Sequence, residues 1–144
     1  MPKSFTAPYT VTIGDINYGG HLGNDRALLI FQDARIRFLE HLGFSEDNIG
    51  EAKGVVVVEA GCRYLLQVFL HEELEIQVTV QELGGKKCSL DYSVVRLSDG
   101  QKVLAGFTVM LAYDYTSHKV VQLPEPFLLH CRQWLSASTS PSLG

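Results

Sequence analysis

The sequence predicts an α+β domain in which a curled antiparallel sheet surrounds one long helix. Three observations support this fold class: a single early stretch with helical periodicity, a long following region with strand periodicity, and two strong hairpin signals. The chain has 144 residues, of which 46% are hydrophobic, so it can bury the core of one domain. We therefore expect a single domain over residues 1–135 and a disordered, serine-rich tail over residues 136–144.

Residues 6–13 are expected to form the first strand, because Tyr9, Val11 and Ile13 occupy alternate positions. A long helix follows, with Asn24 as the expected N-cap and Gly43 as the residue that ends it. Its apolar positions recur at helical spacing: Ala27, Leu28, Phe31, Ala34, Phe38, Leu39 and Leu42. The additional apolar residues Leu29, Ile30 and Ile36 widen the stripe, which favours a central helix wrapped by a sheet.

The remainder of the chain is strand-like at residues 54–67, 73–83, 86–97, 101–115 and, more briefly, 118–122. Gly84-Gly85 and Ser98-Asp99-Gly100 predict tight reversals, so the last three long strands should form a meander. Residues 55–58 are all valine and predict either a central strand or a strand that a partner subunit covers. A short terminal helix is expected after Pro124 and Pro126.

Composition excludes several classes of function. A formal net charge of −4 and a pI near 5.7 supply no basic face for nucleic acid. Neither a signal-peptide core nor a membrane span is evident, and the three cysteines have no Cys-x-x-Cys spacing, so we expect a soluble cytoplasmic protein. The histidines form no close pair, and nucleotide-binding fingerprints are missing from the sequence, so neither a metal nor a cofactor is expected.

The loop at residues 14–24 is the predicted site, because it combines glycines with polar side chains just before the long helix. A glycine-rich loop at a helix start leaves backbone N–H groups available for an anion or a developing oxyanion. We assign Gly20, Gly23 and Asn24 to substrate binding through this backbone, although turn geometry and helix capping are alternative roles for them. The candidate catalytic side chains nearby are Asp15, Asn17 and His21.

These residues also carry a family resemblance, which extends over residues 6–123. The chain resembles the hotdog-fold thioesterases related to 4-hydroxybenzoyl-CoA thioesterase and the long- and short-chain acyl-CoA thioesterases. The matching motifs are Asp15-x-Asn17-x-x-Gly20-His21-x-x-Asn24, the helix stretch at residues 31–39, and Glu59 followed by Arg63-Tyr64 and Glu73-Leu74. The resemblance implies a hotdog fold and hydrolysis of an acyl-CoA or acyl carrier thioester.

In the family, a backbone N–H at the start of the central helix polarises the thioester carbonyl, and a carboxylate acts as nucleophile or general base. This chain departs from the family at that carboxylate, where it has Asn17. An amide cannot take a proton from water, and a missing general base costs about 10²–10⁴ in rate. Asn17 can still hold the attacking water or donate to the thioester carbonyl.

Three side chains are candidates for the missing base, and each has an alternative role. Asp15 projects to the same side as Asn17 if the backbone is extended, or it caps the loop. Glu59, on the strand after the helix, can be supplied by the same subunit or a partner, or it is a solvated carboxylate paired with Arg63. His21 suits proton transfer near neutral pH, or its ring bonds loop carbonyls.

Two further functions compete with hydrolysis. The replacement of the family's acid by Asn17 also fits a catalytically weak or silent hotdog module that binds an acyl thioester or a partner protein. A hydratase or dehydratase is the third alternative. The sheet edges and the valine run predict a homodimer or a dimer of dimers, as in the resembling proteins, with the acyl site between subunits.

Overall fold

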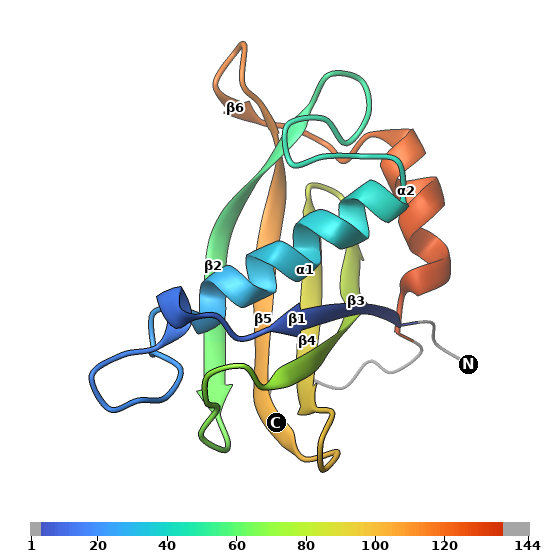
Figure 1. Cartoon of the computed structure of the whole chain (residues 1–144). Helices are drawn as coiled ribbons and strands as arrows, with labels where there is room; N and C mark the ends of the chain where they lie inside the picture. The colour runs from blue at the N-terminus through green and yellow to red at the C-terminus, as the bar shows by residue number, and fades with distance from the viewer. Residues whose placement is uncertain (1–3, 137–144) are drawn as a thin grey trace.

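The computed structural model of the chain describes residues 4–136, which form one antiparallel sheet curled around helix α1 (Figure 1). Helix α1 spans Ala27–His41 and a short helix α2 spans Glu125–Cys131. The strands are β1 (Phe5–Thr10), β2 (Gly54–Tyr64), β3 (Glu73–Gly84), β4 (Lys87–Arg96), β5 (Lys102–Asp114) and β6 (Lys119–Val120). This arrangement confirms the predicted fold class.

The sheet has the order β1-β3-β4-β5-β2, and β6 pairs with β5. Strands β3, β4 and β5 form the predicted meander, and Gly85 and Gly100 have the positive φ that their tight turns require. The inward positions alternate as expected: Leu74, Ile76, Val78 and Val80 of β3 are fully buried, as are Leu90 and Val94 of β4. Hydrophobic burial on one face therefore fixes the register of the meander.

Helix α1 lies in the concave face of the sheet (Figure 1). Its residues Ile30, Phe31 and Phe38 are buried. The ring of Phe31 stacks on Tyr92 of β4, with ring centroids 4.6 Å apart. The buried guanidinium of Arg35 donates from Nε to Glu46 at 2.6 Å. A buried charge is tolerated only when it is paired, so this ion pair ties α1 to the segment that follows it, while Arg35 Nη1 donates to the Tyr92 and Thr108 hydroxyls of the sheet at 3.4 Å.

The contact between α1 and β5 depends on Gly106, which lies opposite Phe31. A Cβ at this position would lie 2.5 Å from the Gly61 carbonyl oxygen and would also overlap the Phe31 ring. We therefore expect Gly106→Ala to lower the free energy of unfolding by about 2–3 kcal/mol, as overpacked cores do. Chemical denaturation measures this loss. Gly84→Ala is the matched control, since no atom lies within 4 Å of its Cβ position, and an equal loss in both variants would contradict the argument.

The first strand is shorter than predicted. Residues 6–13 were expected to alternate, but β1 ends at Thr10 and Ile13 is 74% exposed in a 3-10 turn over Ile13–Asp15. Thr12 and Asp15 form a capping box at this turn, which directs the chain away from the sheet. The apolar alternation at Tyr9 and Val11 therefore does not extend to Ile13.

The expected N-cap of the long helix is also wrong. Helix α1 begins at Ala27 with Arg26 in the cap position, and no side chain makes a capping hydrogen bond there. Asn24 lies in the preceding turn, where its carbonyl oxygen accepts a hydrogen bond from the Tyr64 hydroxyl. At the other end the prediction is confirmed, because Gly43 follows the helix with a φ of +89°.

Strand β2 is an edge strand, so the prediction of a central position for the valine run is wrong. Val55 is buried, whereas Val57 and Val58 are 45% and 54% exposed. Leu29 and Ile36 on the outer side of α1 are exposed as well, so the sheet wraps only one side of the helix. An edge strand and a helix face with exposed apolar side chains therefore remain uncovered in the single chain.

The region after β6 forms the short terminal helix that was predicted. Pro126 lies in the first turn of α2 rather than before the helix. Proline is tolerated there because an N–H group in the first turn has no intrahelical acceptor. Phe127 and Cys131 bury the helix against the core. The backbone N–H of Ser136 donates to the Val80 carbonyl at 2.7 Å, so Ser136 is tied to the sheet. The other residues of the predicted tail, 137–144, lie outside the described residues.

Neither helix in the described part of the chain has the length and apolar content needed to cross a bilayer.

Candidate active site

The loop between β1 and α1 is closed by its own backbone. Ile16 and Leu22 form an isolated bridge, and the Asn17 N–H donates to the His21 carbonyl at 3.0 Å. The Gly20 N–H donates back to the Asn17 carbonyl at 3.0 Å, and Gly20 has a φ of +78°. Gly20 therefore serves the turn, and its N–H is not available to a ligand.

The Asn17 side chain folds over this turn. Its Oδ1 accepts the Gly19 N–H at 2.9 Å, which is the geometry of an Asx turn. The side chain is exposed, and its amide nitrogen donates to no acceptor in residues 4–136. The Asn17 amide is thus held in place through its oxygen and presents its N–H₂ group to solvent.

His21 is oriented by one ring nitrogen and leaves the other unused. Its Nδ1 lies 3.2 Å from the Leu22 carbonyl oxygen. Because a carbonyl oxygen only accepts, Nδ1 carries the proton in this pair, and Nε2 of the neutral ring keeps a free lone pair. Nε2 lies 2.9 Å from the position that a Cβ of residue 19 would occupy, so Gly19 leaves room for the ring. His21 can therefore accept a proton at Nε2.

Asp15 is committed to the end of β1. It is 8% exposed, and its Oδ2 accepts from the Tyr9 hydroxyl at 2.8 Å, the Thr12 N–H at 2.9 Å and the Thr12 hydroxyl at 3.1 Å. Burial, followed by the hydrogen bond and charge of Asp15, raises the pKa of Tyr9 to about 12, so Tyr9 remains a donor. This arrangement matches the loop-capping alternative for Asp15 rather than a base.

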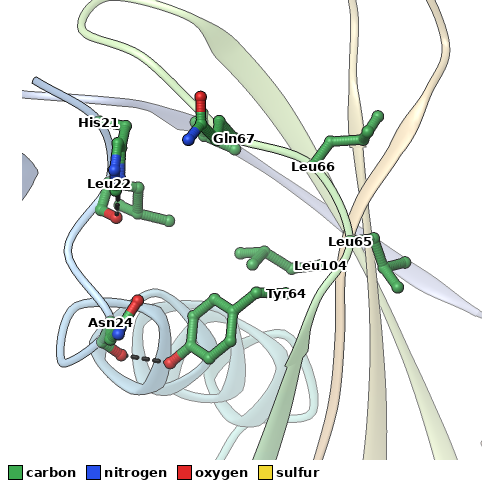
Figure 2. Close-up of a pocket in the computed structure, with 9 residues that line it drawn as sticks. His21, Leu22, Asn24, Tyr64, Leu65, Leu66, Gln67 and Leu104 are labelled. Atoms are coloured by element: carbon green, nitrogen blue, oxygen red, sulfur yellow. Dashed lines mark hydrogen bonds between the residues drawn. The ribbon is translucent and has the colours of Figure 1, made fainter. Parts of the chain in front are cut away.

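The start of α1 offers backbone donors. The Gly23 N–H donates to the Asp15 carbonyl at 2.9 Å, so Gly23 is not the donor that its position suggested. By contrast, the N–H groups of Asn24 and Asp25 have no acceptor in the described residues. The Tyr64 hydroxyl donates to the Asn24 carbonyl and holds this peptide in place (Figure 2). Of the predicted oxyanion donors, Gly20 and Gly23 have their N–H groups bonded within the loop, whereas the N–H of Asn24 and that of the next residue, Asp25, are available.

A pocket of about 180 Å³ opens beside these groups (Figure 2). His21, Leu22 and Asn24 line one side, and the segment after β2 together with Leu104 of β5 lines the other. Sequence reasoning placed His21 and Asn24 here but missed the second side. The missed residues are Tyr64, Leu65, Leu66, Gln67, Val68 and Leu104. The local signal for Leu65 and Leu66 is an apolar pair directly after a strand, and Tyr64 is part of the family motif, but nothing local marks Leu104.

The segment after β2 is held by Arg96 at the end of β4. Its Nη1 donates to the Gln67 carbonyl at 3.1 Å, and its guanidinium also pairs with Glu72 at 3.5 Å and Asp99 at 2.8 Å. Glu72 in turn accepts the Phe69 N–H at 2.8 Å. These bonds fix the pocket wall before any ligand is present.

Glu59 does not reach the loop within one chain. A register shift between Val57 and Glu59 in β2 reverses the faces of the following residues. Val57 pairs with the inward-facing Met110, whereas Glu59 pairs with Val109 on the outer face of the sheet. Glu59 also lies five residues before Tyr64, about 16 Å along the strand. Its side chain is exposed on that face.

Cys62 lies on the inner face of β2, two residues before Tyr64, and is half-buried. Burial raises the pKa of its thiol, although a hydrogen bond with Tyr64 acts in the opposite direction. A thiol with a raised pKa is a poor nucleophile, which agrees with a packing role. No group of three or more metal-ligating side chains occurs within residues 4–136.

The chain matches a known family over most of its length. The model of the thioesterase-like superfamily matches residues 11–131. The uncharacterized protein YsmA of Bacillus subtilis is 29% identical over 132 residues, which cover 90% of this chain and 88% of that protein.

Two further similar proteins are described by names that mention CoA or a CoA thioester. The L-carnitine dehydrogenase/betainyl-CoA thioesterase of Agrobacterium fabrum is 26% identical over 124 residues, which cover 86% of this chain and 25% of that protein. This chain therefore spans about a quarter of that relative. The solved structure of the hypothetical protein SAV2348 from Staphylococcus aureus in complex with CoA is 21% identical, with a TM-score of 0.83, and the match covers 98% of this chain and 91% of that one.

Proposed function

Since the chain belongs to the thioesterase-like superfamily, we propose that it hydrolyses an acyl-CoA thioester to a free acid and CoA. The observation that carries this proposal is the pocket at the start of α1. His21 and Asn24 line this pocket, His21 has one ring nitrogen without a partner, and the N–H groups of Asn24 and its neighbour Asp25 have no acceptor in the described residues. When water attacks a thioester carbonyl, the reaction requires a base and an oxyanion site. His21 can supply the base, and the backbone N–H groups can supply the oxyanion site.

The proposed reaction assigns one role to each group. The thioester carbonyl oxygen accepts hydrogen bonds from the backbone at Asn24 and Asp25, which stabilise the negative charge of the tetrahedral intermediate. His21 Nε2 removes a proton from water, and the Asn17 amide holds that water. When the carbon–sulfur bond breaks, the imidazolium returns the proton to the leaving thiolate. Asp15 keeps the loop in place and does not contact the reacting atoms.

Coenzyme A is the proposed thiol carrier. The name of the Agrobacterium fabrum relative includes a betainyl-CoA thioesterase, and the similar Staphylococcus aureus structure is a complex with CoA. An acyl carrier protein is the alternative donor. Thiol release from a panel of short, long and aromatic acyl-CoA compounds, followed with a thiol-reactive dye, tests the proposal. Release above background with any of them supports hydrolysis, whereas release from none would contradict it.

A silent binding module is the competing function, and Asn17 is the observation that favours it, because an amide replaces the acid at this position and the neighbouring Asp15 carboxylate is committed to Tyr9 and Thr12. This alternative predicts that an acyl-CoA raises the melting temperature without being hydrolysed. Thermal denaturation with and without an acyl-CoA, run beside the thiol assay, separates the two functions.

We also propose that two copies of the chain pair through the edge of β2. The exposed Val57 and Val58 on this edge, and Leu28, Leu29 and Ile36 on α1, form an apolar surface that a second copy would cover. A dimer of dimers is the larger assembly that the same fold allows. Sedimentation velocity at micromolar concentration tests this, and a monomer would contradict it.

The Tyr64 hydroxyl should affect the rate through the peptide it holds. Tyr64→Phe removes the hydrogen bond to the Asn24 carbonyl, which is worth about 1 kcal/mol, so we expect kcat to fall about five- to tenfold with little change in KM. Steady-state kinetics checks the separate effects on kcat and KM.

Tyr115→Phe is the matched control for this variant. The Tyr115 hydroxyl donates to the Val55 carbonyl at 2.7 Å, and its side chain is about as exposed as that of Tyr64. Both variants should lose a similar amount of stability, but only Tyr64→Phe should lower kcat. An equal loss of activity in both would show that Tyr64 acts through stability alone.

A further inference from the structure

The pocket beside His21 has a definite size and chemistry, which restrict the acyl group. We propose that this pocket selects an uncharged acyl group of up to about six carbon atoms or one aromatic ring, an inference that rests on the proposed function. A quaternary ammonium acyl group such as betainyl is accordingly a poor substrate for this chain, even though a relative carries that name.

The size follows from the volume and from the walls. The pocket measures about 180 Å³, and an apolar cavity of about 150 Å³ in another protein holds one benzene molecule. Leu22, Val68 and Leu104 are buried, so these walls are packed against the core and cannot retreat without opening a gap. Arg96 holds the backbone of the opposite wall at the Gln67 carbonyl, and the side chains of Leu65 and Leu66 in this wall are partly exposed. A long acyl chain therefore has to leave part of its length outside.

The charge selectivity follows from the lining side chains. Five of the nine lining residues are leucine or valine, and the polar ones are His21, Asn24, Tyr64 and Gln67. None of the nine is a carboxylate. Quaternary ammonium groups are bound by aromatic cages, and this pocket contains the single phenol ring of Tyr64. A buried cation without such partners loses its hydration and gains little in return.

The closest carboxylate along the chain does not change this conclusion. Asp25 follows Asn24 at the helix start, but its side chain is 82% exposed and lies 3.9 Å from the Arg26 guanidinium. It is not part of the pocket lining. Its charge is therefore screened by solvent and by Arg26.

An isosteric pair of substrates isolates the effect of charge. 3,3-Dimethylbutyryl-CoA and betainyl-CoA have acyl groups of the same shape, and they differ by a carbon atom in place of the quaternary nitrogen. We expect kcat/KM to be at least about tenfold higher for the neutral compound. Hexanoyl-CoA and benzoyl-CoA should likewise exceed palmitoyl-CoA by at least about tenfold, because the pocket holds their whole acyl group.

A single substitution should weaken the charge preference. Gln67→Glu places a carboxylate in the pocket lining with almost no change in shape, so kcat/KM for betainyl-CoA should rise several-fold relative to the neutral isostere. Gln77→Glu is the matched control, since Gln77 is exposed on β3 and pairs with Thr6 and Ser93 away from the pocket. The control should leave the ratio of the two substrates unchanged.

The outcomes separate this inference from the proposed function. Equal use of the isosteric pair, or a preference for betainyl-CoA, would overturn the charge selectivity, and a preference for palmitoyl-CoA would overturn the size limit. Hydrolysis of none of these compounds would contradict the proposed function instead. In that case the same compounds bind without being cleaved, and calorimetry can compare their binding constants. The inference then predicts tighter binding of the neutral isostere than of betainyl-CoA, and of hexanoyl-CoA and benzoyl-CoA than of palmitoyl-CoA.

Discussion

Replacing His21 by glutamine is expected to lower kcat for acyl-CoA hydrolysis by about 10²–10⁴, the usual contribution of a general base. The Nδ1 hydrogen bond to the Leu22 carbonyl leaves Nε2 as the free acceptor at the pocket mouth, and neither nitrogen nor oxygen of a glutamine amide takes up a proton near neutral pH. The glutamine N–H₂ group can still donate to the Leu22 carbonyl, so the loop should keep its conformation. Steady-state kinetics across the pH range measures the effect.

The pH profile distinguishes a base from a structural imidazole. With His21 as the base, the rate of the native protein falls as the ring becomes protonated, and His21→Gln removes this fall along with most of the rate. His130→Gln is the control, since His130 is exposed on α2 and contacts the Phe44 ring, away from the loop. An unchanged pH profile at reduced stability in His21→Gln would contradict the assignment and leave His21 a structural role.

The sequence predicted the fold well wherever burial depends on local periodicity. The alternation at Leu74, Ile76 and Val78 is confirmed, because one face of β3 is buried from Leu74 to Val80. The predicted central position of β2 was wrong, because the place of a strand in a sheet does not depend on local periodicity. The order of strands in a sheet depends on pairing between distant segments, and a run of valines looks the same at an edge as in the centre.

The candidate site was predicted in part. The loop carrying Asn17 and His21 was located from its composition, because glycines and polar residues before a helix form a local pattern. Tyr64 and Leu104 come from other strands, so only the tertiary structure places them beside the loop. The position of Glu59 could not be predicted from the strand pattern, and its role as a base supplied by a partner subunit stays a prediction. A single bulge after Val57 reverses the faces of β2, and period-two reasoning cannot detect it.

Asn17→Asp should raise kcat about 10- to 100-fold, because it restores the carboxylate that the resembling enzymes carry at this position. The substitution fits the structure. An aspartate oxygen can accept the Gly19 N–H as Asn17 Oδ1 does at 2.9 Å, and the second oxygen takes the place of an amide nitrogen that donates to no acceptor in residues 4–136. The new base would thus lie in the loop without any repacking. Thiol release with the best acyl-CoA substrate measures the gain.

Asn48→Asp is the matched control for this variant, because Asn48 Oδ1 accepts the Gly50 N–H at 2.9 Å in the same Asx geometry, outside the site. It should leave kcat unchanged. Combining Asn17→Asp with His21→Gln tests whether the carboxylate replaces the imidazole: the combined variant should retain far more activity than His21→Gln alone. A fall in rate for Asn17→Asp would contradict this prediction and would mean that the reaction needs the amide N–H₂ as a donor.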